Sequence, residues 1–350
     1  MTGVIAYDVV MCIIVFIFGT VIGSFLNVVI YRTPLHMSIV TGPSHCTTCG
    51  TRIKPYDLVP IISWCLLGGK CRACKAKISA RYTIVEALTG VLFLLAYIRF
   101  SLSLMLPIAI ILFGVLVVLS FIDLDHMQIP YWCTVTVAVL GVINILLNNL
   151  LDTPSQSNVW WVHLLAALIC AVITGLLALL GGLGGGDFQL MTAAALLLGI
   201  QIVPAAFIGI ILGAIYGIIV KIRTKNTVKE KTAAVTDAFL NWFEEHEPET
   251  DKIIMGEYEE GKCRLTQYVF KGKSLEEAET DKALEESFTE IFSDIPHNNE
   301  YIFRIATKDG TLDKLRLQRR IAFGPALSVG IVIGMLYGYQ ILSVWLNITM

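Results

Sequence analysis

Long apolar runs separated by polar segments dominate the chain. A helix needs about 20 largely apolar residues to cross a bilayer. Runs of this kind occupy residues 9–31, 83–99, 103–122, 129–148, 160–182, 188–203, 204–222 and 322–346. The pattern therefore predicts about eight transmembrane helices, with the division of 188–222 placed between Gln201 and Pro204.

Composition and charge agree with membrane embedding. The 350 residues are 55% hydrophobic and 15% charged, and the mean hydropathy is +0.71, which is too apolar for an ordinary soluble enzyme. Nearly all charges fall in two stretches, roughly 32–82 and 221–320. Because Lys and Arg gather in cytoplasmic loops, we expect both stretches to be cytoplasmic and both termini to lie outside.

Four of the nine cysteines form two Cys-x-x-Cys pairs, separated by residues 50–70. Two such pairs on tight turns are typical of a structural zinc site, in which four thiolates surround the metal. Disulfides are the alternative, and the expected cytoplasmic compartment disfavours them. We therefore predict structural zinc bound by Cys46, Cys49, Cys71 and Cys74.

Two aspartates lie at the predicted cytoplasmic ends of membrane helices. Asp123 ends the third run, and Asp187 opens the sixth run directly after Gly184, Gly185 and Gly186. Ionisable groups at a membrane edge are candidates for function. Two carboxylates held close together supply one general base and one general acid, which water attack on an amide requires. As an alternative, Asp187 caps a helix.

Two further acidic residues are secondary candidates. Asp125 follows Asp123 by two residues and is interpreted as a hydrated neighbour or a positioning group. Glu86 lies near the start of the second run, where it is expected to cap the helix, pair with Arg81 or help to bind a ligand. We favour the structural roles for Glu86.

Several blocks of sequence together resemble the bacterial type IV prepilin peptidases, also called prepilin leader peptidase/N-methyltransferases. These proteins are membrane aspartyl proteases of the Gly-x-Gly-Asp type. The resemblance runs through most of the chain, and the order of the blocks supports it. The blocks are Gly23-Ser-Phe-Leu-Asn-Val-Val-Ile-Tyr-Arg32, the paired Cys-x-x-Cys motifs, Ile78-Ser-Ala-Arg-Tyr82 with Glu86 and Thr89-Gly90, Phe121-Ile-Asp123 with Pro130, Gly184-Gly-Gly-Asp187, and Phe323-Gly-Pro-Ala-Leu327.

The resemblance implies that Asp123, and not Asp125, pairs with Asp187. It also implies removal of the leader of a prepilin or pseudopilin at the cytoplasmic face, followed by methylation of the new amino terminus from S-adenosylmethionine. The site of this methyl donor is not assigned, because the sequence has no Rossmann-like glycine signature. The implied location is the bacterial cytoplasmic (inner) membrane. The implied partners are the substrate, the bilayer and the machinery of pilus assembly or type II secretion, without nucleic acid.

The chain departs from the family pattern at three places. Gln189 stands where the family usually has Lys, and Tyr131 stands where it usually has Asp. The third departure is a polar insertion at about 223–320. Its pattern predicts helices at 232–246 and 274–292 and strands at 262–271 and 301–307. Disorder of the insertion is the alternative. Its role is open and could be partner docking, substrate gating or tethering.

The predicted fold is an all-α polytopic membrane protein with a cytoplasmic zinc-binding loop domain and a small α+β cytoplasmic insertion. Besides the peptidase, two other functions are open. One is an ion-coupled transporter that uses Asp123 and Asp187 as ion ligands, and the other is an inactive, zinc-stabilised assembly platform. The predicted divisions are a first helix at 1–32, the zinc domain at 33–82, a catalytic core at 83–222, the insertion at 223–320 and a last helix at 321–350.

Overall fold

The structure is a computed structural model that describes residues 2–40, 42–150, 160–180, 183–246, 252–259, 262–270, 278–293, 301–308, 311–319 and 321–346. Residues 151–159, between the apolar runs expected at 129–148 and 160–182, are outside the described residues. Contacts divide the chain into two units, and the first contains Met1–Gly213 together with Phe323–Met350. The second unit is Ala214–Ala322.

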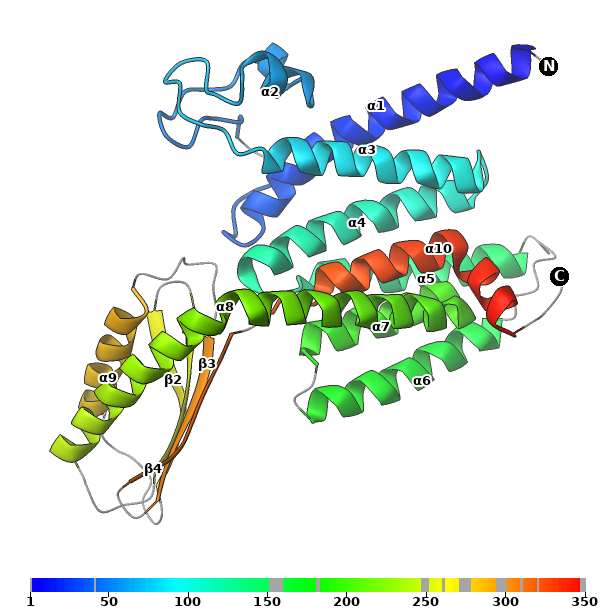
Figure 1. Cartoon of the computed structure of the whole chain (residues 1–350). Coiled ribbons are helices and arrows are strands. Elements are labelled where there is room, and N and C mark those ends of the chain that lie inside the picture. The colour runs from blue at the N-terminus through cyan, green and yellow to red at the C-terminus, as the bar shows by residue number, and fades with distance from the viewer. Residues whose placement is uncertain are drawn as a thin grey trace. The chain divides into compact units, whose positions relative to one another are not determined.

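The first unit is helical (Figure 1). Seven segments in the described part are long and apolar enough to cross a membrane, and the sixth runs through both α7 and α8. The predicted helical membrane fold is therefore confirmed, while the count of eight spans stays a prediction. The helices are α1 (Thr2–Arg32), α3 (Arg81–Phe100), α4 (Met105–His126), α5 (Tyr131–Leu150), α6 (Trp160–Leu179), α7 (Gly185–Leu198), η2 (Gly199–Gln201), α8 (Ile202–His246) and α10 (Gly324–Leu346), with η1 (Pro55–Leu58) and α2 (Ile62–Leu66) in the polar loop.

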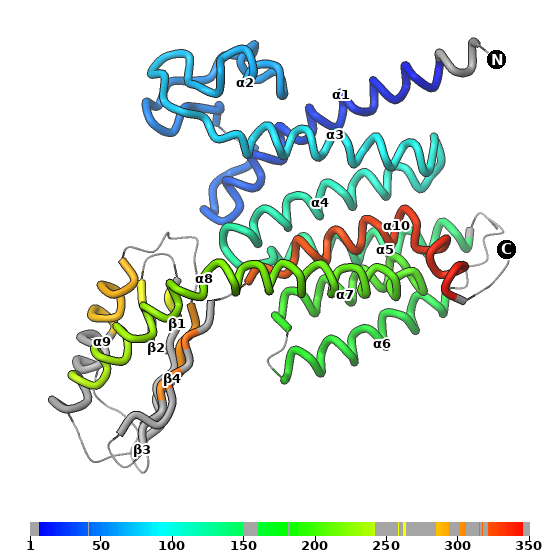
Figure 2. Tube along the Cα trace, in the orientation of Figure 1, coloured from blue at the N-terminus to red at the C-terminus, as the bar shows by residue number. Residues whose placement is uncertain are grey.

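Helices α1 and α3 pack closely because small residues face one another. A Cβ atom on Gly19 would lie 2.8 Å from the Gly90 Cα, and one on Gly23 would lie 2.8 Å from the Glu86 Cα. Gly19 and Gly23 form a small-x-x-x-small pattern, which lets membrane helices approach through their backbones. This contact fixes the end of α1 beside the start of α3 (Figure 2).

Helix α4 is the most enclosed of the candidate membrane spans. It packs against α1, α3, α5 and α10, and side chains such as Leu112, Phe113 and Leu119 have no exposed surface. Its outer surface is therefore covered by protein along most of its length. The residues at its last turn bond Arg81 of α3 and Gly324 of α10.

Helix α10 packs on the first part of α8 through three glycines at four-residue spacing. A Cβ on Gly330 would lie 2.2 Å from the Ala205 carbonyl oxygen, and one on Gly334 would lie 2.6 Å from the Ala205 Cβ. A Cβ on Gly338 would lie 2.9 Å from the Gln201 Cβ. The glycines thus allow two apolar helices to touch through their backbones.

The break between α7 and α8 lies at Gly199–Gln201, two residues before the expected position. Gly199 has a positive φ of 58°. Two buried polar side chains bond the carbonyls at the end of α7: the Asn144 amide donates to the Leu197 oxygen at 3.1 Å, and His163 Nδ1 lies 3.0 Å from the Leu196 oxygen. They satisfy backbone groups that a lipid environment leaves without partners.

The second unit contains the rest of α8, a four-stranded sheet and α9 (Ala278–Ile291). The strands β1 (Lys252–Glu259), β2 (Lys262–Phe270), β3 (Tyr301–Lys308) and β4 (Thr311–Arg319) are antiparallel in the order β2-β1-β3-β4. The core includes Phe239 of α8 and Phe292, the residue directly after α9. The ring of Tyr258 stacks on Phe292 at 4.8 Å, and its hydroxyl donates to the Phe292 carbonyl at 2.9 Å.

The expected α+β character of the insertion matches the described part of this unit, with three differences. The predicted strands correspond to β2 and β3, whereas β1 and β4 were not predicted. The helix expected at 232–246 is the end of α8, which continues for 45 residues without a break. Of the helix expected at 274–292, residues 274–277 lie outside the described part of the chain.

Gly330→Ala should destabilise the first unit, although alanine is the better helix former by about 1 kcal/mol. The added methyl group overlaps the backbone of α8, and overpacking of this kind costs about 1–3 kcal/mol. We expect a lower midpoint of thermal unfolding in detergent. The control is Gly114→Ala in α4, where a Cβ has only an ordinary 3.7 Å contact with Leu26. Equal midpoints for the two variants would contradict the packing described here.

Candidate active site and metal centre

Asp123 lies in the last turn of α4, and its side chain is 5% exposed. Its Oδ2 atom accepts a 2.8 Å hydrogen bond from the backbone N–H of Gly324. Met127 ends the helix in a left-handed conformation, with φ of 51°, and donates its N–H to the Asp123 carbonyl at 2.9 Å. The carboxylate is thereby fixed by two segments that are 201 residues apart in sequence.

The start of α10 is shaped to receive Asp123. A Cβ on Gly324 would lie 2.8 Å from Asp123 Oδ2 and 3.3 Å from a methyl carbon of Leu119. Phe323 lies against Gly213 of α8 so closely that a side chain at Gly213 would overlap the Phe323 ring. The Phe323-Gly324 pair therefore positions a candidate catalytic residue, a role that the sequence did not reveal.

Asp187 is the third residue of α7. The residue that precedes the helix is Gly184, which is extended with φ of −72° and ψ of 151°, so Asp187 is not the capping residue. The Asp187 side chain is half-buried, and its Oδ2 lies 3.0 Å from the position that a Cβ on Gly184 would take. The amino terminus of a helix favours a carboxylate at this place.

Gly186 connects the loop before Asp187 to the turn after Asp123. A Cβ on Gly186 would lie 2.9 Å from the Ile129 Cβ, and Ile129 belongs to the turn between α4 and α5. Helix α5 also packs along α7. The glycine next to Asp187 and the turn that follows Asp123 are thus in direct contact.

Asp125 forms an ion pair with Arg81, the first residue of α3. The shortest oxygen to nitrogen distance is 2.6 Å, and Arg81 also donates to the Phe121 carbonyl at 3.1 Å. The guanidinium lies 5.1 Å from the centre of the Phe121 ring. Asp125 therefore has a positioning contact that ties the end of α4 to α3.

Glu86 is 8% exposed and does not pair with Arg81. Its Oε2 accepts a 2.7 Å hydrogen bond from the backbone N–H of Ile61. Ile61 has φ of 62°, an unfavourable conformation for a β-branched residue. Glu86 therefore has a structural role, because its carboxylate holds the polar loop against α3.

The four predicted zinc ligands come together in space. The Sγ atoms of Cys46, Cys49, Cys71 and Cys74 all lie within 4.8 Å of one another, and those of Cys46 and Cys74 are 3.9 Å apart. Four sulfurs placed at about 2.3 Å around a tetrahedral metal would have similar separations. No disulfide joins the cysteines in the described part of the chain. The donor set fits zinc.

The two Cys-x-x-Cys turns repeat the same backbone pattern. In the first, the Gly50 N–H donates to the Cys46 carbonyl at 2.8 Å, and in the second, the Lys75 N–H donates to the Cys71 carbonyl at 3.0 Å. Gly50 and Lys75 both have positive φ, of 69° and 61°. Gly68 and Gly69, which also have positive φ, follow the end of α2 and lie before the second turn.

The electrostatics of the cluster favour a bound cation. Backbone N–H groups lower the pKa of Cys46 and Cys71, and the Thr51 hydroxyl lowers the pKa of Cys49. A backbone N–H from Ala76 also acts on Cys74, but desolvation and the other three sulfurs raise its pKa to about 11. A fourth thiolate is therefore unfavourable beside three others unless a metal ion neutralises the charge.

Comparisons with known proteins identify two family domains in the chain. Residues 17–100 match the bacterial peptidase A24 N-terminal domain, and residues 110–218 match the type IV leader peptidase family. The chain is 35% identical to the prepilin leader peptidase/N-methyltransferase of Bacillus subtilis, over 58% of this chain and 81% of the relative. The proteins of that name from Myxococcus xanthus and Neisseria gonorrhoeae are 33% and 32% identical, over 66% and 59% of this chain and 71% and 81% of the relatives.

The chain belongs to the type IV leader peptidase family. The matched segment 110–218 contains both candidate aspartates and ends before most of the second unit. Membership in a peptidase family does not favour the transporter interpretation. No solved structure matches the chain.

Cys71→Ser and Cys46→Ser should each release the metal, because a four-sulfur site loses a charged ligand. Zinc in the purified protein, measured by mass spectrometry, should fall from about one ion per chain to a small fraction. Cys65→Ser is the matched control, since Cys65 is exposed in the same loop and is not one of the four clustered thiols. Unchanged zinc content in the first two variants would refute the site.

Gly324→Ala should displace the Asp123 carboxylate, because the new methyl group would lie 2.8 Å from Oδ2. We expect cleavage of a prepilin substrate to slow by about 100-fold, the scale expected for a small misplacement of a catalytic group. Zinc content should stay at the wild-type level. Gly114→Ala is again the control, and equal cleavage rates for the two variants would show that Gly324 does not position Asp123.

Proposed function

We propose that this protein is a membrane aspartyl endopeptidase that removes the leader of type IV prepilins or pseudopilins and N-methylates the new terminal residue. The observation that supports this most strongly is the environment of Asp123, whose buried carboxylate accepts a hydrogen bond from the backbone N–H of Gly324. Family membership and the printed activity of the relatives point to the same reaction.

In this proposal, Asp123 and Asp187 form the catalytic pair. Two carboxylates in a low-dielectric site share a proton, because both cannot ionise easily. The ionised member takes a proton from water, which attacks the scissile carbonyl, and the protonated member donates to the leaving amine. The Gly324 N–H holds one oxygen of Asp123, and the contact between Gly186 and Ile129 supports a common location for the two residues.

Asp125 is assigned a different role from Asp123. Its carboxylate is paired with Arg81 at 2.6 Å, and this pair holds the end of α4 against the start of α3. The ion pair supports the choice of Asp123 as the catalytic member of the Asp-x-Asp sequence. Tyr131 is 71% exposed, and Gln189 is also exposed. We therefore assign their departure from the family pattern to substrate preference.

The proposed topology has eight spans, with the zinc loop and the insertion on the cytoplasmic side. Basic residues follow the first and seventh predicted spans, as the distribution of Lys and Arg in membrane proteins favours. The last turn of α4 and the first turn of α7 then face the cytoplasm. A prepilin whose apolar segment lies in the bilayer would present its leader boundary at this level.

Zinc has a structural role in this proposal. Four cysteines leave no open coordination position, so the metal supplies folding energy to the loop and takes no part in hydrolysis. Arg72, between two of the ligands, donates to Asp57 at 2.6 Å and 2.9 Å and joins the second turn to η1. The methyl donor is S-adenosylmethionine.

Asp123→Asn and Asp187→Asn should each slow cleavage of a purified prepilin in detergent by about 10³-fold or more, because an amide cannot exchange the proton that catalysis needs. Zinc content and the thermal midpoint should stay near the wild-type values. Asp125→Asn is the internal comparison, and we expect it to keep most of the cleavage rate. Wild-type cleavage by either of the first two variants would exclude the proposed pair.

A further inference from the structure

Helix α8 carries four basic side chains directly after its apolar first part. They are Lys221, Arg223, Lys225 and Lys229, and all four are exposed. The three lysines recur every four residues and therefore lie along one side of the helix. The first acidic residue of α8 is Glu230. The four residues, which all belong to the second unit, are called the basic surface below.

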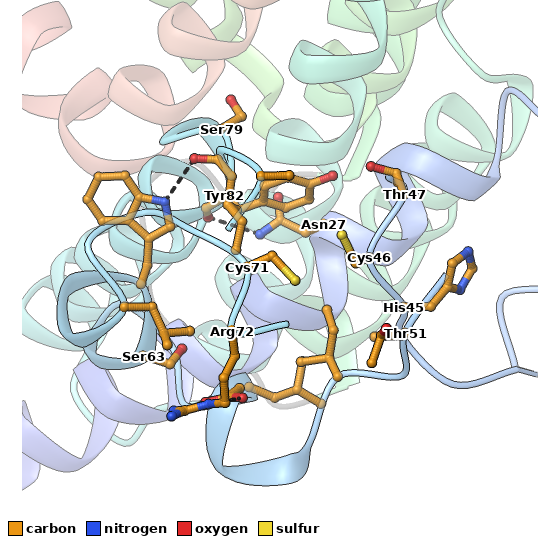
Figure 3. Close-up of a pocket in the computed structure, with 18 of the residues that line it drawn as sticks. Asn27, His45, Cys46, Thr47, Thr51, Ser63, Cys71, Arg72, Ser79 and Tyr82 are labelled. Atoms are coloured by element: carbon orange, nitrogen blue, oxygen red, sulfur yellow. Dashed lines mark hydrogen bonds and ion pairs between the residues drawn. The ribbon is translucent and has the colours of Figure 1, made fainter. Parts of the chain in front are cut away.

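No acidic side chain in the described part of the chain forms an ion pair with the basic surface. Other basic residues do have partners within the fold. Arg72 pairs with Asp57 at 2.6 Å in the zinc loop (Figure 3), and Arg81 pairs with Asp125 at 2.6 Å. Lys231, the next lysine of α8, is buried and donates to the last carbonyl of α9 at 2.7 Å. The fold of the second unit therefore uses Lys231, whereas the basic surface faces the surroundings.

The spacing of the lysines is unfavourable for the helix itself. Like charges four residues apart repel each other and destabilise a helix, and Lys225 has such a neighbour on each side, at Lys221 and Lys229. Basic residues in the last turn of a helix are stabilised by its dipole, but α8 continues to His246. The repulsion between the lysines is offset if an anionic surface lies against them.

The basic surface begins where the membrane-spanning part of α8 ends. Ile218, Ile219 and Ile222 are exposed and belong to a segment apolar enough to cross a membrane. Ile222 stands between Lys221 and Arg223, so the apolar and the basic parts of the helix meet there. Long basic side chains at the end of a membrane span reach the level of the lipid headgroups. The basic surface therefore starts at the level of the lipid phosphates.

The segment that leads back to the membrane is basic as well. Four basic residues and no acidic residue lie between Asp313 and Ile321: Lys314, Arg316, Arg319 and Arg320. Ile321 lies close to α8 one turn before Lys221, because a Cβ on Gly217 would be 3.6 Å from the Ile321 Cδ1. Residues 230–313, in contrast, contain 21 acidic and 9 basic residues. The basic residues of the insertion are thus concentrated in the two segments that join it to membrane helices.

We propose that the basic surface binds the phosphates of anionic phospholipids and holds the second unit at the membrane face. Clusters of four to eight Lys and Arg directly beyond a membrane helix are typical of segments that bind anionic lipid. Residues 221–229 contain no aromatic residue, although aromatic residues are common in protein interfaces and in sites for single-stranded nucleic acid. Of the roles open to the insertion, tethering is the one that this proposal supports, and it does not depend on the peptidase reaction.

The test is equilibrium binding of phosphatidylglycerol and of phosphatidylcholine to the full-length protein in detergent, measured by native mass spectrometry. One basic residue near an anionic surface contributes about fivefold to binding. The double variant Lys221→Gln/Lys225→Gln should therefore raise the dissociation constant for phosphatidylglycerol about tenfold or more. The dissociation constant for phosphatidylcholine should not change. Glutamine is a good helix former, so the thermal midpoint of this variant should not fall.

The matched control is Lys262→Gln/Arg304→Gln, which removes two exposed basic residues from the sheet of the same unit. It should bind phosphatidylglycerol as the wild type does. Lys221→Arg/Lys225→Arg should also keep the wild-type affinity, because it retains both charges.

Three outcomes would overturn the assignment. Equal weakening by the two glutamine variants would show that net charge alone attracts the lipid. Unchanged binding of phosphatidylglycerol by Lys221→Gln/Lys225→Gln would place the lipid elsewhere on the protein. Equal affinities of the wild type for the two lipids would exclude an anionic headgroup as the partner of the basic surface.

Discussion

The hydrogen bond from the Gly324 N–H to Asp123 is the interaction on which the arrangement of the first unit depends. It joins α10 to α4 across 201 residues of sequence, and it needs the close approach that Gly324 alone permits. The second unit interrupts the chain between Gly213 and Phe323, yet these two residues are in contact. An insertion whose ends lie together changes little in the structure that it interrupts. The contact between Gly324 and Asp123 is therefore formed although α10 follows a long polar segment.

The helices of the first unit could be predicted from hydropathy because apolar length is a strong signal in membrane proteins. The break between α7 and α8 was placed only approximately. Its position depends on Asn144 and His163, which lie in other helices and bond the carbonyls before Gly199. In the second unit, β4 carries an alternation that includes Leu315 and Leu317, a short signal that is easily missed among charged neighbours. Strands of this kind are recognised through their partners across the sheet.

In the candidate site, too, some features could be predicted from the sequence and others could not. The clustering of the four cysteines could be predicted because their spacing is the chemical signal itself, whereas the catalytic pairing of the aspartates stays a prediction, based on the rarity of ionisable groups within membrane segments. The groups that position them could not be derived, since they act through the backbone or across helices. Gly324 contributes only an N–H, and Arg81 reaches Asp125 from a different helix. Such contacts cannot be recognised in the local sequence pattern, although both residues lie in blocks that resemble the family.

A zinc ion in the four-cysteine loop would stabilise a conformation that the sequence does not favour. The two Cys-x-x-Cys turns are equivalent, but the residue with positive φ is Gly50 in one and Lys75 in the other. A left-handed residue other than glycine costs about 1–2 kcal/mol, and Ile61 adds similar strain where it bonds Glu86. Structural zinc supplies about 10–16 kcal/mol in small metal-dependent domains, which is enough to offset both. Because Ile61 lies in the same loop and donates its N–H to Glu86 of α3, metal binding would also stabilise the contact between this loop and the helices.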